Sequence, residues 1–280
     1  MATVALVWGA TFVVVKAALA EISTVYFLVL RFWMAALCMT LLFVGTFRGA
    51  GWRAVLKGLK GGAIAGIFLW AGYILQTFGL KYTTAGKSGF ITGLYIVLVP
   101  LLSAGLYKQW PQISELLGVT IAAAGLILLT LPSLDTVVNL GDLLTVACAV
   151  AFAIHLLVLG YYSQREKFEA VALGQILGAA ALSTFALLIE KPHAIWSANV
   201  VVALLMTSVF ATAIAFALQT WGQQYTTATR TALIFALEPV FALFTAVALG
   251  GEVLTLNGLA GAALILGGIL FVELKPLKNR

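Results

Sequence analysis

QTFGLKYTTA at residues 76–85 and QTWGQQYTTA at residues 219–228 are two copies of one segment. Seven of the ten positions are identical at an offset of 143 residues. The same offset aligns further pairs beyond the segment: Lys87 with Arg230, Ile91 with Ile234, Leu94 with Leu237, Gly118 with Gly261 and Gly125 with Gly268. We therefore predict an internal repeat, with residues 1–136 as the first half and residues 137–280 as the second.

The composition around these segments is typical of a membrane protein. The chain has 280 residues, of which 62% are hydrophobic and 9% charged, whereas soluble domains average about 45–50% and about 25%. So few charges cannot cover the surface of a soluble domain of this size. The two cysteines, Cys38 and Cys148, both lie in apolar stretches, which excludes a secreted disulfide scaffold, and the high hydrophobicity excludes a disordered chain.

Apolar runs separated by short breaks are predicted to form ten transmembrane helices. At roughly 20 residues per span they use about 200 residues, which leaves no room for a second soluble domain. The first run has no basic segment before it, so it is interpreted as a span rather than a signal peptide. The one extended polar connection is expected between Arg48 and Lys60. The predicted spans are 3–20, 23–46, 59–80, 85–107, 113–131, 140–161, 169–189, 197–221, 228–249 and 254–273.

The basic residues predict the orientation of these spans, because cytoplasmic loops carry an excess of Lys and Arg. With the N-terminus inside, eleven of the 16 Lys and Arg residues fall on the inner side and three on the outer side. Both termini are therefore predicted to lie inside, in what we expect to be a bacterial inner (cell) membrane. The charges are spread over many short loops, so the net charge of +6 does not indicate nucleic-acid binding.

Five spans in each half have a topological consequence. Because five is odd, the two halves enter the membrane from opposite sides, which is the inverted repeat found in many secondary transporters. The two YTTA segments then lie on opposite faces, where they would suit two alternating gates. Simple helix N-capping by their threonines is the alternative. The predicted fold class is an all-α membrane protein with ten transmembrane helices in two inverted five-helix repeats around a central cavity.

The second half contains Glu238–Pro239, Gly251–Glu252, Gly261 and a glycine-rich last helix, and WGATF at 8–12 precedes Arg31 in the first half. This pattern resembles the EamA-type signature of the drug/metabolite transporter superfamily. The resemblance implies a ten-helix transporter of small metabolites, often an exporter, and is greatest to exporters of aromatic amino acids. The first half departs from the signature, because Tyr95–Ile96 replaces Glu–Pro and Pro100 stands four residues late.

Pro100 and Pro239 lie inside corresponding spans of the two halves. Each removes a backbone hydrogen bond and frees a carbonyl group, at Ile96 and at Phe235. In a membrane such a carbonyl must face protein or a water-filled cavity. We therefore predict two broken helices beside a central site; a packing kink is the alternative.

Aromatic, hydroxyl and amide side chains recur on single helix faces and could line an amphipathic substrate cavity. Ordinary packing or an aromatic belt at the membrane interface would produce similar stripes, and a lone histidine is often a hydrogen-bonded packing residue. The candidate cavity residues are Trp8, Thr11, Phe12, Tyr73, Gln76, Thr77, Thr92, Tyr95, His155, Phe216, Gln219 and Glu238.

Ionisable residues within the spans are costly and therefore informative. Glu238 is the one carboxylate predicted near the bilayer centre, and without a relay of further acids we expect it to support the broken helix; a proton carrier is the alternative. Arg31 is expected to face protein and bind carbonyl groups. Glu115 and Asp142 stand at helix ends and are expected to act as capping or loop residues.

Other chemistries lack the residues that they need. AGKS at 85–88 is not a P-loop, because Lys81 stands where the first glycine belongs, so no ATP-driven pump is predicted. The cysteines and histidines have no zinc spacing, and no metal or cofactor is expected. An intramembrane enzyme would need paired carboxylates or a nucleophile and base, so we predict that the protein is not an enzyme.

The predicted function is secondary transport, as an exporter or facilitator, of small amphiphilic metabolites, including aromatic amino acids. The alternatives are a proton-coupled exporter of drugs or other metabolites and, with less support, an intramembrane enzyme. The expected partners are the small-molecule substrate and membrane lipid, without nucleic acid, and the oligomeric state is left open.

Overall fold

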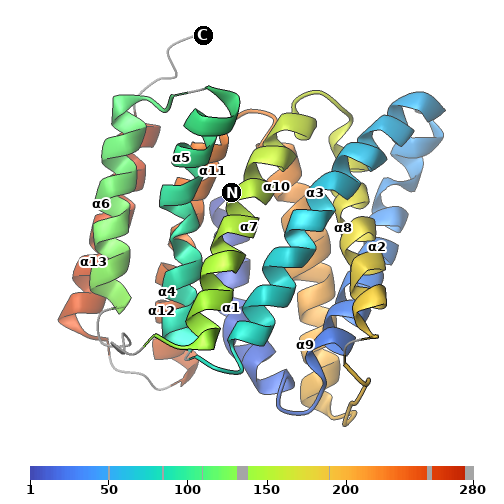
Figure 1. Cartoon of the computed structure of the whole chain (residues 1–280), viewed down its shortest axis with the longest axis horizontal. Helices are drawn as coiled ribbons and strands as arrows, with labels where there is room; N and C mark the ends of the chain where they lie inside the picture. Colours follow the sequence, from blue (N-terminus) through green and yellow to red (C-terminus); the bar gives the residue numbers. More distant parts are fainter. Residues whose placement is uncertain are drawn as a thin grey trace.

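The computed structural model describes residues 1–49, 51–83, 85–108, 110–130, 138–188, 190–250 and 254–274. The predicted boundary between the halves, at 136–137, and Gly251–Glu252 lie outside them. The regular elements within these ranges are helices, joined by one isolated bridge between Ile22 and Ala194. The helices are α1 (Ala2–Ala18), α2 (Thr24–Arg48), α3 (Trp52–Gly79), α4 (Ala85–Gly93), α5 (Tyr95–Tyr107), α6 (Ile113–Thr130), α7 (Leu140–Ser163), α8 (Phe168–Ala186), α9 (Ala198–Ser208), the π-helix η2 (Val209–Ile214), α10 (Ala215–Gly222), α11 (Ala228–Phe235), α12 (Leu237–Gly250) and α13 (Leu256–Glu273) (Figure 1).

Several of these helices join end to end into longer rods. α4 and α5 meet at Leu94, α11 and α12 meet at Ala236, and α9, η2 and α10 run on without a gap. Among the described residues, nine single helices or joined rods are long and apolar enough to cross a membrane, and α1 supplies a shorter apolar helix. The all-helical membrane fold expected from the composition is confirmed at this level.

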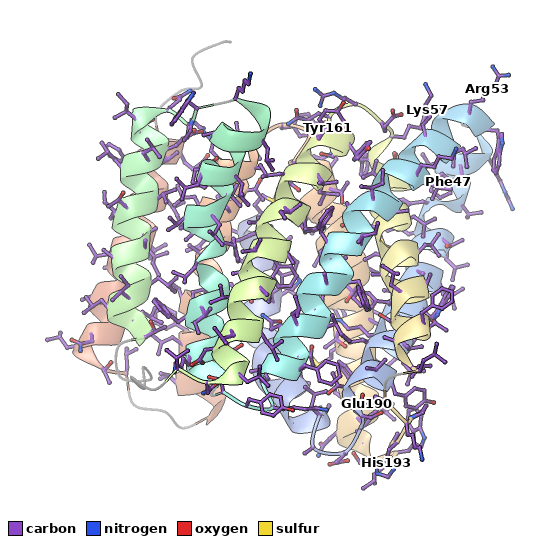
Figure 2. The ribbon with its side chains drawn as sticks, in the orientation of Figure 1. Phe47, Arg53, Lys57, Tyr161, Glu190 and His193 are labelled. Atoms are coloured by element: carbon purple, nitrogen blue, oxygen red, sulfur yellow. The ribbon has the colours of Figure 1, made fainter. Side chains whose placement is uncertain are left out.

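One expected connection is wrong. The polar stretch from Arg48 to Lys60 was predicted to be an extended loop, but α3 begins at Trp52 and has 28 residues. At 1.5 Å per residue it is roughly 42 Å long, which exceeds a hydrocarbon core of about 30 Å. Arg53 and Lys57 are exposed one turn apart on this overhang (Figure 2), so charge marks where the helix leaves the apolar layer rather than where it ends.

The bundle has two ends, which we name after labelled residues. The Arg53 face carries Arg53, Lys57 and Tyr161 (Figure 2), together with the connections 164–167 and 223–227. The Glu190 face carries Glu190 and His193, together with the connections 19–23 and 80–83. There Lys81 Nζ lies 2.9 Å from Glu190 Oε1, and the Ser23 amide donates to the His193 carbonyl at 2.8 Å.

Glycine allows two helices from different halves to touch along their backbones. A Cβ atom on Gly125 of α6 would lie 2.6 Å from the carbonyl oxygen of Gly261 of α13, and one on Gly261 would lie 2.6 Å from the oxygen of Gly125. Such small-residue contacts stabilise helix pairs where lipid removes the hydrophobic driving force. The two glycines belong to the aligned series of the repeat.

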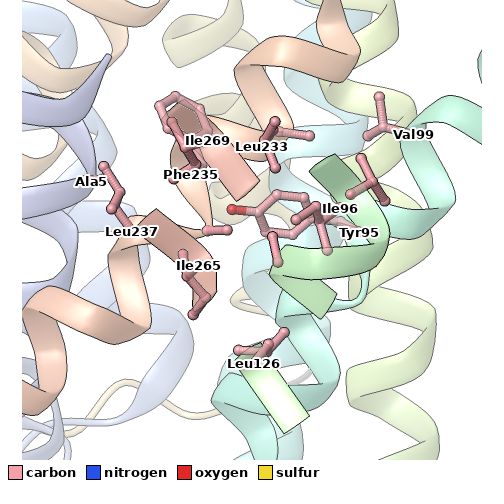
Figure 3. Close-up of a cluster of buried hydrophobic side chains, with 14 of the residues drawn as sticks. Ala5, Tyr95, Ile96, Val99, Leu126, Leu233, Phe235, Leu237, Ile265 and Ile269 are labelled. Atoms are coloured by element: carbon pink, nitrogen blue, oxygen red, sulfur yellow. The ribbon is translucent and has the colours of Figure 1, made fainter. Parts of the chain in front are cut away.

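The largest apolar cluster surrounds the two broken rods. Figure 3 shows Tyr95 and Ile96, just after the interruption at Leu94, close to Phe235 and Leu237 on either side of Ala236. Ala5 of α1 belongs to the same cluster. The breaks of the two halves therefore meet in one packed region.

Candidate functional site: a central cavity

A cavity of about 600 Å³ lies within the bundle. The structure brings together eleven of the twelve cavity residues predicted from the sequence, and the side chain of Phe12 lies outside the described ones. The walls come from both halves of the chain, through α1, α2, α3, α7, α10 and the rods α4–α5 and α11–α12. The eleven residues are Trp8, Thr11, Tyr73, Gln76, Thr77, Thr92, Tyr95, His155, Phe216, Gln219 and Glu238.

The cavity opens toward the Glu190 face. Leu19, Ala20, Lys81 and Thr83 line it, and they stand in or beside the connections 19–23 and 80–83. Lys81 is 45% exposed at its side chain, so the lining reaches bulk solvent there. Among the described lining residues, none comes from a connection on the Arg53 face.

Packing and hydrogen bonds close the end toward the Arg53 face. Gln223 is fully buried and its Nε2 donates to the Leu156 carbonyl at 3.1 Å. Gln164 donates to the Gln223 and Thr226 carbonyls at 3.2 and 3.3 Å. These bonds tie the end of α7 to the connection between α10 and α11, so the cavity is a pocket with one mouth rather than a channel.

Aromatic rings form much of the apolar wall. Trp8 lies 5.3 Å from Phe216 and 5.0 Å from Phe235 between ring centroids. Tyr73 makes edge contacts with Phe152 at 5.6 Å and with Phe216 at 6.5 Å. Offset and edge-on arrangements are the favourable ones for aromatic pairs. Phe152 and Phe235 line the cavity as well, although their sequence context did not separate them from ordinary core residues.

A π-helix behind this wall binds two of its lining side chains, Trp8 and Arg31. In η2 the wider turn loosens the regular hydrogen-bond ladder, and the Ala211 carbonyl accepts from Trp8 Nε1 at 2.8 Å. Arg31 Nη2 approaches the same oxygen at 3.4 Å, and Arg31 Nε donates to Thr212 Oγ1 at 2.7 Å. Arg31 thus binds a carbonyl as expected, but it also lines the cavity, which the sequence analysis missed.

Buried amides and hydroxyls form a second polar layer. His155 Nε2 lies 2.8 Å from Gln175 Oε1, and Gln175 Nε2 donates to Thr220 Oγ1 at 3.0 Å. Gln219, one turn before the end of α10, is buried, and its Oε1 has no hydrogen-bond partner among the described residues. His155 is therefore both a hydrogen-bonded packing residue and part of the cavity wall.

The helix interruptions lie before the prolines rather than at them. Leu94 precedes Pro100 by six residues, and Ala236 precedes Pro239 by three. At the second break the Ala236 amide is shared between the Ala232 and Leu233 carbonyls, at 3.2 and 3.1 Å, which is the tightening typical of a helix end. The freed carbonyls expected at Ile96 and Phe235 lie within two residues of these interruptions and stay a prediction.

Glu238 stands two residues after the break at Ala236, in the first turn of α12. Its repeat equivalent is Tyr95, and both line the cavity. No hydrogen bond or ion pair joins the Glu238 carboxyl group to another described side chain. The equivalent positions of the two halves therefore meet at the same cavity with different chemistry.

Two buried ion pairs follow the repeated segments. Lys87 Nζ lies 2.6 Å from Asp142 Oδ2, and Arg230 Nε lies 3.4 Å from Glu115 Oε1. Lys87 and Arg230 are equivalent in the repeat, whereas the two acids are not. Asp142 also forms a capping box with Asn139. The interpretation of both acids as capping or loop residues was therefore incomplete, because sequence spacing does not reveal which helix ends meet.

The capping role predicted for the YTTA threonines is confirmed on one side. Thr227 is the N-cap of α11, and its side chain accepts from the Arg230 amide at 3.2 Å. Thr84, its counterpart, lies outside the described residues. Thr83 donates instead to Asp142 Oδ1 at 2.7 Å.

Comparison with known families decides the class of the protein. The family model described as "EamA-like transporter family" matches residues 1–131 and 139–274. The chain belongs to the EamA-like transporter family. Membership in this family, together with the apolar helices, makes the protein an integral membrane transporter and points away from an enzyme.

Relatives of this EamA-family protein carry compatible names. An "Uncharacterized transporter" of Archaeoglobus fulgidus is 37% identical over 276 residues, covering 98% of this chain and 85% of that protein. The "Uncharacterized transporter YoaV" of Bacillus subtilis is 23% identical, with 95% and 93% covered. A solved structure titled "Crystal structure of protein" has a TM-score of 0.79 at 19% identity, with 98% and 96% covered, which supports the fold alone. None of these names states a substrate.

Proposed function

We propose that this EamA-family protein transports small amphiphilic metabolites, among them aromatic amino acids, as an exporter or facilitator. The observation that carries the proposal is the cavity. Its volume of about 600 Å³ falls within the range of about 300–1,000 Å³ typical of small-molecule sites. It is large enough for one aromatic amino acid, and its walls combine aromatic rings with hydroxyl and amide groups.

The transport mechanism that we propose is alternating access between two inverted repeats, residues 1–136 and 137–280. The pairing of Tyr95 with Glu238 at one cavity, and the interruptions at equivalent rods, support this relation. From the positive-inside rule we propose that the Arg53 face lies in the cytoplasm of a bacterial cell. With that orientation the cavity opens outward, and the inward-open state would require the packing around Gln223 to separate.

Proton coupling to drug or metabolite export is a second candidate, because Glu238 lines the cavity without an ion-pair partner. Against it, the other ionisable groups that line the cavity within the described residues are bases and phenols: Arg31, Lys81, His155 and two tyrosines. A proton path through the membrane usually uses several acids or histidines in sequence. We therefore favour downhill transport.

An intramembrane enzyme receives less support. His155, the one histidine of the cavity wall among the described residues, is bound to Gln175 rather than to a nucleophile or an acid. Glu238 has no second carboxylate beside it in the described lining. Neither residue forms the nucleophile–base or acid pair that hydrolysis needs.

Purified protein in liposomes tests the proposal with a panel of labelled amino acids, with and without a pH gradient. We expect saturable uptake of aromatic amino acids down their gradient. Thr11→Trp, which places a large ring in the cavity, should abolish uptake, whereas Thr40→Trp on the exposed side of α2 should not. Equal uptake by protein-free liposomes, or by the Thr11→Trp variant, would refute the proposal.

A further inference from the structure

Arg31 is a buried cation at the cavity wall without a carboxylate partner among the described residues. Its exposed fraction is 5%, and its hydrogen bonds to described residues all go to neutral acceptors: Thr212 Oγ1, Tyr73 Oη and the Ala211 carbonyl. By contrast, Lys81, the other strong base in the described lining, is paired with Glu190. A guanidinium group taken out of water without a counter-charge is costly.

The same contacts fix the orientation of the guanidinium group. Nε and Nη2 are held by η2 and by Tyr73, whose ring centroid lies 4.8 Å from Arg31 Cζ. Nη1 makes no hydrogen bond to a described residue. Nη1 is therefore the nitrogen of this fixed guanidinium group whose N–H donors remain for a carboxylate that enters the cavity.

Glu238 does not supply the missing negative charge. It lines the same cavity, but no ion pair joins it to Arg31. A negatively charged group of the ligand can supply this counter-charge.

We propose that Arg31 is the carboxylate-binding residue of the cavity, and that the transported molecule presents a free carboxylate to it while its apolar body rests on Trp8 and Tyr73. This inference rests on the proposed transport function and names the chemical group that the site selects. We call Arg31 in this role the anchor. The π-helix then holds the anchor in place, because it presents the Ala211 carbonyl and Thr212 Oγ1 together.

Three related ligands test the anchor in equilibrium binding to the purified protein and in liposome exchange: L-phenylalanine, 3-phenylpropanoate, which lacks the amine, and L-phenylalaninamide, which lacks the carboxylate. The wild-type protein should bind L-phenylalanine about tenfold or more tightly than the amide, as expected for loss of a charge-assisted hydrogen bond. Arg31→Gln should weaken the two carboxylates about tenfold or more and the amide less than about threefold. Lys57→Gln, which removes an exposed cation outside the cavity, should change none of the three.

Each result has a distinct meaning. If the wild-type protein binds and exchanges none of the three compounds, the proposed function fails and the anchor with it. If it exchanges L-phenylalanine but binds the amide equally well, or if a folded Arg31→Gln weakens all three equally, the anchor alone is refuted. If Arg31→Gln does not fold, Arg31→Lys is the second variant, because it keeps the charge but not the planar guanidinium group. It should reduce the preference for L-phenylalanine over L-phenylalaninamide, and an unchanged preference would contradict the proposal.

Discussion

Tyr73 joins the polar anchor to the aromatic wall. Its hydroxyl oxygen accepts from Arg31 Nη2 at 3.1 Å, while its ring contacts Phe32 at 5.4 Å and Phe152 at 5.6 Å between centroids. One side chain therefore orients the guanidinium group and also lines the cavity. Substitutions that separate the hydroxyl from the ring can measure the two contributions.

Tyr73→Ala should weaken substrate binding by about 0.5–2 kcal/mol, because both the ring contact and the support of Arg31 are lost. Tyr73→Phe keeps the ring and should cost less. Competition binding in detergent measures both. Tyr225→Ala, at an exposed residue outside the cavity, serves as the control, and equal effects of Tyr73→Ala and Tyr225→Ala would contradict a role in the site.

Glu238→Gln should retain most downhill transport, because glutamine keeps the size of the side chain and adds a donor at the broken helix. An imposed pH gradient should not drive accumulation in the wild-type protein, since no relay of further acids lines the described wall. Liposome uptake under a pH gradient measures both. Uphill accumulation that Glu238→Gln abolishes would show proton coupling instead.

The sequence predicted single residues of the site well where side-chain type and helix face coincide. Tyr73 and Gln76 share a face of one span, so periodicity could place them together. Arg31 was recognised as buried, but its position at the cavity depends on η2, and nothing in VFATAI at 209–214 distinguishes a π-helix from an α-helix. Arg31 and Trp8 bind this segment from positions 181 and 203 residues earlier in the chain, and helix periodicity does not reveal such contacts.

At the scale of elements, the apolar runs predicted which segments cross the membrane, but the ends and breaks depended on neighbours. The predicted span began at residue 59, but α3 begins at Trp52. Charged residues can stand in a helix where it extends beyond the apolar layer of the membrane, so they do not mark the end of the helix. The interruption at Leu94 lies six residues before Pro100, beyond the Ile96 carbonyl whose hydrogen bond the proline removes. The position of the proline therefore did not predict the position of the break.

The contact between α6 and α13 gives a matched test within one helix. A Cβ on Gly268 would lie 2.7 Å from the Gly118 carbonyl oxygen, whereas a Cβ on Gly267 meets nothing within 4 Å. Gly268→Ala should therefore destabilise the protein by about 1–3 kcal/mol through overpacking. Gly267→Ala should leave stability unchanged or raise it by up to about 1 kcal/mol, because alanine is the better helix former.

Thermal unfolding in detergent distinguishes the two variants. Equal melting temperatures for Gly267→Ala and Gly268→Ala would mean that α6 and α13 do not approach as closely as described. A loss in Gly268→Ala that Gly118→Ala does not share would locate the strain elsewhere than in this contact.

At the scale of the whole molecule, the repeat in the sequence predicted which positions correspond, but not which helices touch. Lys87 and Arg230 could be aligned from QTFGLKYTTA and QTWGQQYTTA, yet their partners Asp142 and Glu115 come from positions that the repeat does not relate. Contacts between helix ends depend on how the two halves dock. The inversion itself, and the side of the membrane on which each face lies, stay predictions.

Cysteine labelling of intact cells tests orientation and opening together, in a background without Cys38 and Cys148. A membrane-impermeant thiol reagent should label Leu19→Cys at the cavity mouth and, more slowly, Thr11→Cys within the cavity. Arg53→Cys should be labelled only after the membrane is permeabilised. Labelling of Arg53→Cys in intact cells would reverse the proposed topology, and protection of Thr11→Cys would contradict an outward opening.

The single mouth of the cavity also determines where the membrane voltage acts. With the proposed orientation, water entering the pocket from the Glu190 face would carry the outside potential deep into the protein, and most of the voltage would fall across the packed layer around Leu156 and Gln223. An ion that crossed this layer would exchange up to about 2.3 kcal/mol per charge for each 100 mV. A zwitterion has no net charge, so its crossing exchanges none of this energy, and its binding beside Arg31 leaves the net charge of the site unchanged while the layer opens and closes.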